Sequence, residues 1–217
     1  MTWFVQTIIT AITAFAATNI DDIVVLMVFF AQVNAVFRPR HIIAGQYLGF
    51  MALVIVSLVG FVGGMVLPKE WIGCLGIVPI VIGIKQFSDR ETDEPIQTVT
   101  DGRNRINTPP KTRSWLTDLL VPQTYQVAAI TFANGGDNIG IYVPLFASSN
   151  GAQLSLLLSI FFLLISVWCG IAYQLTRHPA LACVLTRYGH AIVPFVLIGL
   201  GIFILLDNGT YQLLFKV

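Results

Sequence analysis

The sequence predicts an all-α, polytopic membrane protein in which six transmembrane helices form two inverted three-helix repeats. Its apolar composition, its six hydrophobic segments and a residue pattern that recurs at a fixed interval lead to this prediction. Hydrophobic residues make up 56% of the 217 residues, and charged residues make up 11%. Soluble domains carry about 25% charged residues, so the composition excludes an ordinary soluble fold. A net charge of +1 gives no electrostatic basis for nucleic-acid binding.

The hydrophobic segments are judged against the roughly 20 residues that a helix needs to span a bilayer. Each half of the chain has a long segment, then an intermediate one, then a short one. We therefore predict a first three-helix repeat at 1–87, a flexible, charged linker at 88–120 and a second three-helix repeat at 121–217. The six segments are Trp3–Val33, Ile42–Leu67, Trp71–Phe87, Val121–Ser148, Leu154–Leu175 and Ala191–Leu206.

The two halves share a residue pattern. Asn134 follows Asn19 by 115 residues, and Asp137 follows Asp22 by the same interval. The tripeptide Ile-Val-Pro at 77–79 also returns at that interval. Because three spans per half is an odd number, the second half must insert in the opposite sense to the first. Inverted repeats of this kind occur in many secondary transporters, whose binding sites lie at the repeat interface.

Lys and Arg are distributed unevenly between the predicted loops. Ten of the twelve fall on one side of the membrane, and only Lys69 and Lys216 fall on the other. Positive residues concentrate in cytoplasmic loops, so we expect the linker in the cytoplasm and both termini outside. The ten residues are Arg38, Arg40, Lys85, Arg90, Arg103, Arg105, Lys111, Arg113, Arg177 and Arg187.

The recurring acidic pattern is the candidate site. A charged group at the centre of a membrane helix costs roughly 2.5–3.5 kcal/mol on insertion scales, so two such patterns predict one polar site between the halves. Carboxylate and amide oxygens suit a divalent cation. Both patterns are poor in helix formers, and we expect each helix to break there. The predicted ligands are Asn19, Asp21, Asp22, Asn134, Asp137 and Asn138. Helix capping or interhelical hydrogen bonding is the alternative role, above all for Asp21 and Asn138.

The charge of this site also predicts a coupling ion. Two carboxylates about 4 Å apart repel each other by about 4 kcal/mol at an effective dielectric constant near 20. A divalent cation cancels that repulsion, and without it the site is expected to take up at least one proton. We therefore expect cation export in exchange for protons. The cation is the substrate, and no permanently bound cofactor is expected.

Two further features of the second segment are assigned to structure. Gly45/Gly49 and Gly60/Gly64 form two small-xxx-small pairs, which are typical of close helix packing in membranes. Gln46 lies near the start of the segment, and we assign it to the membrane interface, with a place on the ion pathway as the alternative.

Several motifs together resemble the CadD-type cadmium-resistance transporters of the lysine exporter (LysE) superfamily. These motifs are Ala17–Asp22, Gly45–Gly49, Trp71–Gly73 with Ile77–Ile80, and Asn134–Gly140. The resemblance implies a six-span protein of the bacterial inner membrane that exports a divalent cation, with cadmium as the first candidate and manganese, zinc or calcium as others. It also implies that the acidic motifs of the first and fourth helices bind the ion.

Some alternatives stay open at the level of sequence. Cadmium is a soft ion that favours thiolate, and Cys169 is assigned to apolar packing, with a ligand role as the alternative. Export of an amino acid or an organic cation is a second function, and an intramembrane aspartyl enzyme that uses Asp22 and Asp137 is a third. A scaffold for membrane assembly would leave the buried acids unexplained. The sequence does not decide between a monomer and a homodimer.

Overall fold

The computed structural model describes residues 2–88, 121–177, 179–208 and 210. Every regular element in this part of the chain is an α-helix, which confirms the predicted all-α class there. The predicted linker at 88–120 lies outside the described residues, apart from Ser88 at the end of a helix.

The helices follow the predicted segments, with three segments each divided into two helices. The division at Leu75–Gly76 was not expected, and the last helix begins at Pro179 rather than near Ala191. The bounds are α1 Thr2–Asn19, α2 Asp22–Ala31, α3 Pro39–Val66, α4 Lys69–Cys74, α5 Ile77–Ser88, α7 Pro122–Asn134, α8 Asn138–Ala147, α9 Gly151–Leu175 and α10 Pro179–Asp207.

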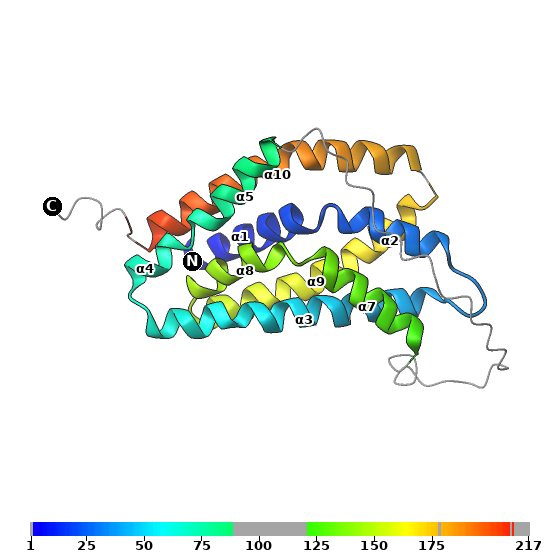
Figure 1. Cartoon of the computed structure of the whole chain (residues 1–217), viewed down its shortest axis with the longest axis horizontal. Helices are drawn as coiled ribbons and strands as arrows, with labels where there is room; N and C mark the ends of the chain where they lie inside the picture. Colours follow the sequence, from blue (N-terminus) through cyan, green and yellow to red (C-terminus); the bar gives the residue numbers. More distant parts are fainter. Residues whose placement is uncertain (1, 89–120, 178, 209, 211–217) are drawn as a thin grey trace.

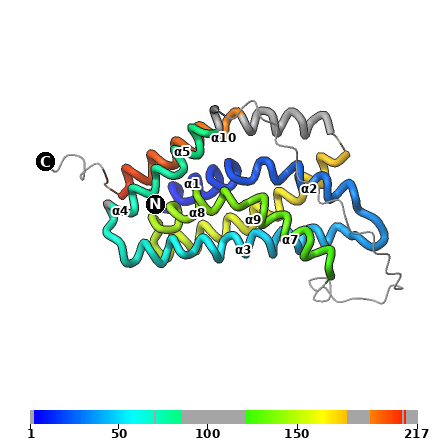
Figure 2. Tube along the Cα trace, in the orientation of Figure 1, coloured from blue at the N-terminus to red at the C-terminus, as the bar shows by residue number. Residues whose placement is uncertain are grey.

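The chain passes back and forth along the long axis of the molecule (Figure 1, Figure 2). α1 and α2 lead away from the end where the chain begins, and α3 returns to that end. α4 and α5 lead away again, α7 and α8 return, α9 leads away, and α10 returns. The first half of the bundle therefore starts at one end of the molecule, and the second half starts at the other.

Glycines on α3 allow the backbones of α7 and α8 to lie directly against it. A Cβ atom added at Gly49 would lie 2.6 Å from the Ala128 carbonyl oxygen of α7, and one added at Gly60 would lie 2.2 Å from the Val143 carbonyl oxygen of α8. Such distances are too short for a side chain, so the predicted close packing is confirmed. The glycines in these contacts are Gly45, Gly49, Gly60 and Gly64.

Two further pairings complete the bundle. α5 packs along α10, and a Cβ atom added at Gly201 would lie 2.4 Å from the Gly76 carbonyl oxygen. α9 packs along both α1 and α2. α3 therefore covers the divided helix α7–α8, and α9 covers the divided helix α1–α2, whereas α5 and α10 cover each other.

Apolar helices identify a membrane protein. In the described residues, α3 and α9 are long and apolar enough to cross a membrane, and α1 with α2 makes a third span if the bent pair counts as one. Shorter apolar helices cover Trp71–Lys85, Asn138–Ala147 and Ala191–Asp207. The membrane character is thus supported, and the full set of six spans stays a prediction.

An aromatic cluster packs beside the junction of α1 and α2. Its five rings come from α1, α3, α8 and α9, and each is at most 1% exposed. The rings contact one another at centroid distances such as 5.1 Å between Tyr142 and Phe161 and 5.7 Å between Phe15 and Phe50. Aromatic pairs at these distances favour tilted and edge-to-face packing. The members are Phe15, Phe50, Tyr142, Phe146 and Phe161.

Candidate functional site

The first predicted helix break is present between α1 and α2. The two helices are bent by 60°, and α1 ends at Asn19. Thr18 Oγ1 donates to the Ala14 carbonyl oxygen at 2.9 Å, and Asn19 Nδ2 donates to the Phe15 carbonyl oxygen at 2.8 Å. Side-chain bonds of this kind compete with the backbone ladder of a helix. The residues of the polar pattern therefore also help to end the helix.

The second predicted break is present between α7 and α8. α7 ends at Asn134 and α8 begins at Asn138. Two glycines, which are poor helix formers, lie between them. A Cβ atom added at Gly135 would lie 2.4 Å from Leu53 Cδ1, so the backbone at this break passes directly over a side chain of α3.

Asp22 lies at the centre of a hydrogen-bond network between the two breaks. Its side chain is 4% exposed. Asp22 Oδ1 accepts from Asn134 Nδ2 at 2.6 Å, and Asp22 Oδ2 accepts from Gln46 Nε2 at 3.4 Å. The donors come from the end of α7 and from α3, so this carboxylate joins three helices. The bond from Asn134 brings the two breaks together.

Gln46 lies inside the bundle, and our assignment of it to the membrane interface is wrong. Its side chain is 4% exposed, and its Oε1 accepts from Thr131 Oγ1 at 2.7 Å. The reason is the glycine contact between α3 and α7, where a Cβ atom added at Gly49 would lie 2.7 Å from Thr131 Cβ. A residue one turn earlier on α3 therefore faces α7 rather than the lipid headgroups.

The amide of Asn19 is held in one orientation. Asn19 Nδ2 donates to the Phe15 carbonyl oxygen, to Thr18 Oγ1 at 2.8 Å and to Tyr142 OH at 2.9 Å. Turning the amide over would place its oxygen against the Phe15 carbonyl, which can only accept. Asn19 Oδ1 is left buried without a hydrogen-bond partner. A buried acceptor in this condition costs about 1–3 kcal/mol, which makes it available to a cation.

Helix α9 contributes two residues beside the first break. Trp168 Nε1 donates to the Asn19 carbonyl oxygen at 2.7 Å. Cys169, which follows it, is buried and belongs to the apolar core.

The other predicted ligands differ in exposure. Asn138 is buried, Asp21 is partly buried, and Asn134 and Asp137 are exposed. Of the three carboxylates, Asp22 is therefore the buried one and Asp137 the exposed one.

The donor set is mixed rather than made of charged ligands alone. Within the described ranges, no group of three or more His, Cys, Asp and Glu side chains gathers closely enough to hold a metal ion. A cation at Asp22 would therefore need amide or backbone oxygens for the rest of its coordination shell. Hard cations such as Ca²⁺ accept both kinds of ligand, and the first break holds one buried amide oxygen without a partner, Asn19 Oδ1.

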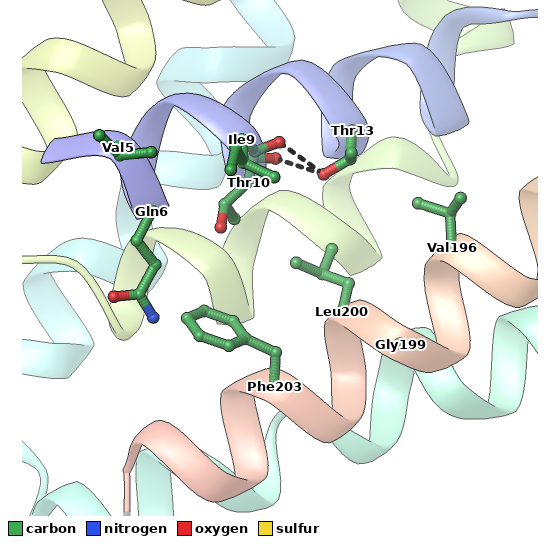
Figure 3. A pocket seen from close by; sticks show the side chains of 9 residues that line it. All are labelled: Val5, Gln6, Ile9, Thr10, Thr13, Val196, Gly199, Leu200 and Phe203. Carbon is green, nitrogen blue, oxygen red and sulfur yellow. Dashed lines mark hydrogen bonds between the residues drawn. The ribbon is translucent and has the colours of Figure 1, made fainter. Parts of the chain in front are cut away.

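A separate groove between α1 and α10 does not belong to this site. It has a volume of about 790 Å³ and is lined mostly by apolar side chains, such as those of Val196, Leu200 and Phe203 (Figure 3). Thr13 lies on its wall, but its hydroxyl donates to the Ile9 and Thr10 carbonyl oxygens of its own helix. Satisfied hydroxyls and apolar walls do not offer ligands to a cation.

Sequence reasoning missed three residues that shape the site, Thr131, Tyr142 and Trp168, and it gave Gln46 a place on the ion pathway only as the alternative. None of them has a counterpart of the same type 115 residues away that would attract notice. One signal was present for Gln46, because it stands beside Gly45 in a glycine pair that predicts a close helix contact. The partner helix of that contact could not be read from the sequence.

Comparison with known proteins identifies the family. No curated protein and no solved structure matches the chain significantly. A family model described as cadmium resistance transporter matches residues 15–217, a range that includes both helix breaks and all six predicted ligands. The chain therefore belongs to the cadmium resistance transporter family, which confirms the resemblance seen in its motifs.

Proposed function

We propose that this protein exports a divalent cation across the bacterial inner membrane in exchange for protons, and that the cation binds between the two helix breaks. Its family indicates metal-ion transport and fits a protein that is not an enzyme. The observation that carries the site is that the first helix break buries both the Asp22 carboxylate and the unpartnered oxygen of Asn19. A buried charge and a buried orphan acceptor are both costly, and one bound cation would satisfy both.

The proposed ligands are oxygen atoms, which bears on the choice of ion. Cadmium is the first candidate because of the family, and manganese, zinc and calcium are the others. Oxygen ligands suit manganese and calcium best, whereas cadmium favours softer atoms. The ligands that we propose are Asn19, Asp21, Asp22, Asn134, Asp137 and Asn138.

The packing supports six spans in two inverted repeats. Exchanging the two halves converts the packing of α3 on α7–α8 into the packing of α9 on α1–α2, and it returns the α5–α10 pair to itself. The connection from α2 to α3, the beginning of α7 and the end of α9 lie toward one end of the molecule (Figure 1). These are the connections rich in Lys and Arg, so we place this end in the cytoplasm and both termini outside.

Cation binding is tested by changing one buried carboxylate and one exposed carboxylate. Asp22→Asn removes the charge at the site, whereas Asp207→Asn removes an exposed charge at the end of α10. Thermal unfolding of the purified full chain is measured with Cd²⁺, Mn²⁺, Zn²⁺, Ca²⁺ and Mg²⁺. A ligand present at a hundred times its Kd stabilises a protein by about 2.7 kcal/mol. The wild-type protein and Asp207→Asn should show this stabilisation with at least one ion, and Asp22→Asn should not. Equal stabilisation of all three proteins would refute the proposed site.

Proton exchange needs a separate measurement. In proteoliposomes that contain a pH-sensitive dye, movement of the preferred cation should acidify the compartment that the cation leaves. An imposed pH gradient should then drive cation movement against its own gradient. Transport that is indifferent to the pH gradient would remove the proton from the mechanism and leave the cation site untouched.

A further inference from the structure

The amides next to Asp22 present their nitrogen atoms to the carboxylate. Asn134 Nδ2 donates to one carboxylate oxygen and Gln46 Nε2 donates to the other. Amide N–H groups carry partial positive charge and would repel a cation bound at the same two oxygens. A carboxylate oxygen can bind a cation and accept a hydrogen bond at once, but an amide that turned over would present an oxygen to the ion in place of its N–H groups.

Gln46 and Asn134 differ in what a turn would cost. Asn134 is exposed, so its amide can turn without breaking a hydrogen bond to a second buried group. Gln46 is buried, and its amide oxygen accepts from Thr131 Oγ1. A buried amide that turns needs a partner able to accept from the nitrogen as well as donate to the oxygen. A hydroxyl group can do both, and Thr131 is itself buried beside Gln46.

We propose that Gln46 is an additional cation ligand that turns over on binding, with Thr131 as the partner that holds it in both orientations. Without the cation, the Gln46 amide nitrogen donates to Asp22 and its oxygen accepts from Thr131. With the cation, the Gln46 oxygen faces the ion and its nitrogen donates to the Thr131 hydroxyl, which has reversed its role. This inference rests on the proposed function, because it concerns the same cation at Asp22.

Helix packing gives Gln46 this position. The contact of Gly49 with Thr131 fixes the distance between α3 and α7, so the amide and the hydroxyl stay within hydrogen-bond reach. The amide needs only to rotate about its terminal bond, and neither helix has to move. Asp22 thus accepts from the Gln46 amide nitrogen before the cation arrives, and it binds the cation itself afterwards.

Two variants of Gln46 separate an oxygen ligand from a nitrogen donor. Gln46→Glu keeps an oxygen for the cation and removes the N–H groups, whereas Gln46→Leu removes both. Cation affinity is measured by calorimetry on the purified full chain, with the ion that stabilises the wild-type protein. We expect Gln46→Leu to weaken binding at least tenfold and Gln46→Glu to bind as tightly as wild type or more tightly. Equal weakening by both variants would show that Gln46 serves only as a donor and would overturn the proposal.

Thr131 is tested by a matched pair. Thr131→Ser keeps the hydroxyl and should bind like the wild-type protein, whereas Thr131→Val should bind about fivefold more weakly, the effect expected for one lost hydrogen bond. Ser57→Ala is the control on α3, because Ser57 is buried and donates to the Leu53 carbonyl oxygen, with no bond to the site. Wild-type affinity in Thr131→Val would contradict the proposed partner.

Infrared difference spectroscopy tests the turn in the wild-type protein itself. The measurement therefore does not depend on whether Gln46→Glu folds. Cation binding should shift a glutamine side-chain carbonyl band in the wild-type protein, and the shifted band should be missing in Gln46→Leu. A wild-type spectrum without that band would overturn the proposal. If the wild-type protein binds no cation, the proposed function fails. If the wild-type protein and Gln46→Leu bind the cation equally well and Asp22→Asn does not bind it, only the role of Gln46 fails.

Discussion

The two helix breaks carry the same sequence pattern but have different surroundings. At the first break, Asn19 and Asp22 are both buried, and Tyr142 and Trp168 hold Asn19 from two other helices. At the second break, the equivalent Asn134 and Asp137 are both exposed. The two breaks therefore share residue types and an interrupted helix, but their equivalent residues differ in burial.

If the cation binds as we propose, this difference predicts separate tasks for the two halves. The first break has the buried carboxylate and the fixed amide, which are the features of a preorganised binding half. The second break has a flexible glycine pair and an exposed carboxylate, and it reaches the first through Asn134. We infer that a cation meets Asp137 before it reaches Asp22, because exposed charges attract ions and buried ones retain them.

The largest expected effect comes from removing the two aspartates separately. Asp22→Asn should lower cation affinity at least a hundredfold, because losing one partner of a buried charge pair costs about 3–5 kcal/mol. Asp137→Asn should lower affinity only about fivefold, since an exposed charge contributes up to about 1 kcal/mol. Calorimetry on both purified variants measures the ratio. Equal losses would show that the exposed position of Asp137 does not persist in the binding form.

The next effect concerns the contact between α3 and the helix of the second break. Gly49→Ala should destabilise the protein by about 1–3 kcal/mol, the usual cost of overpacking, because the new Cβ atom would lie 2.6 Å from a backbone oxygen. It should also weaken cation binding, since Thr131 would move away from Gln46. Gly63→Ala is the control on the same helix, where no atom lies within 4 Å of an added Cβ atom. Thermal unfolding of the two variants should separate them, and matching unfolding temperatures would contradict the packing described here.

The fold was largely predictable, because long apolar segments and two helix-breaking patterns leave strong signals. The breaks after Asn19 and Asn134 follow from local chemistry, which is present in the sequence itself. The division at Leu75–Gly76 has a weaker origin. Gly76 lies against Gly201 of α10. The division between α4 and α5 therefore coincides with a contact between helices rather than with a local sequence pattern.

The site was predictable only as far as the repeat reaches. The repeat pairs Asn19 with Asn134 and Asp22 with Asp137, so a meeting of the two patterns was expected, and the bond from Asn134 to Asp22 joins them. Gln46 and Thr131 could not be paired in this way, because their meeting depends on which helix packs against the glycines of α3. The burial of each aspartate could not be predicted from the sequence either, because Asp22 is buried and Asp137 is exposed although the residue type is the same. These features are set by contacts between helices far apart in the chain.

A smaller effect is expected from loosening the first break. Trp168→Phe removes the donor to the Asn19 carbonyl oxygen and keeps an aromatic ring beside Phe15, whose centroid lies 5.3 Å from that of Trp168. The loss should be about 1 kcal/mol of stability, the net value of one hydrogen bond. Thermal unfolding of the full chain measures it, with Trp71→Phe as the control because Trp71 is 65% exposed. An unchanged unfolding temperature would mean that the first break is held without α9.

The smallest effect is expected at Cys169, and it decides whether the buried half of the site includes a soft ligand. Cys169 packs in the apolar core and follows Trp168, which donates to the backbone of the first break. If all ligands are oxygens, Cys169→Ala should leave the ratio of Cd²⁺ to Mn²⁺ affinity within about twofold of wild type, because removing a thiol that binds neither ion alters neither. A thiolate ligand would contribute to cadmium far more than to manganese. A selective loss of cadmium affinity in Cys169→Ala, absent from Cys74→Ala, would therefore add the thiol to the ligands and place the soft ligand of the site on α9.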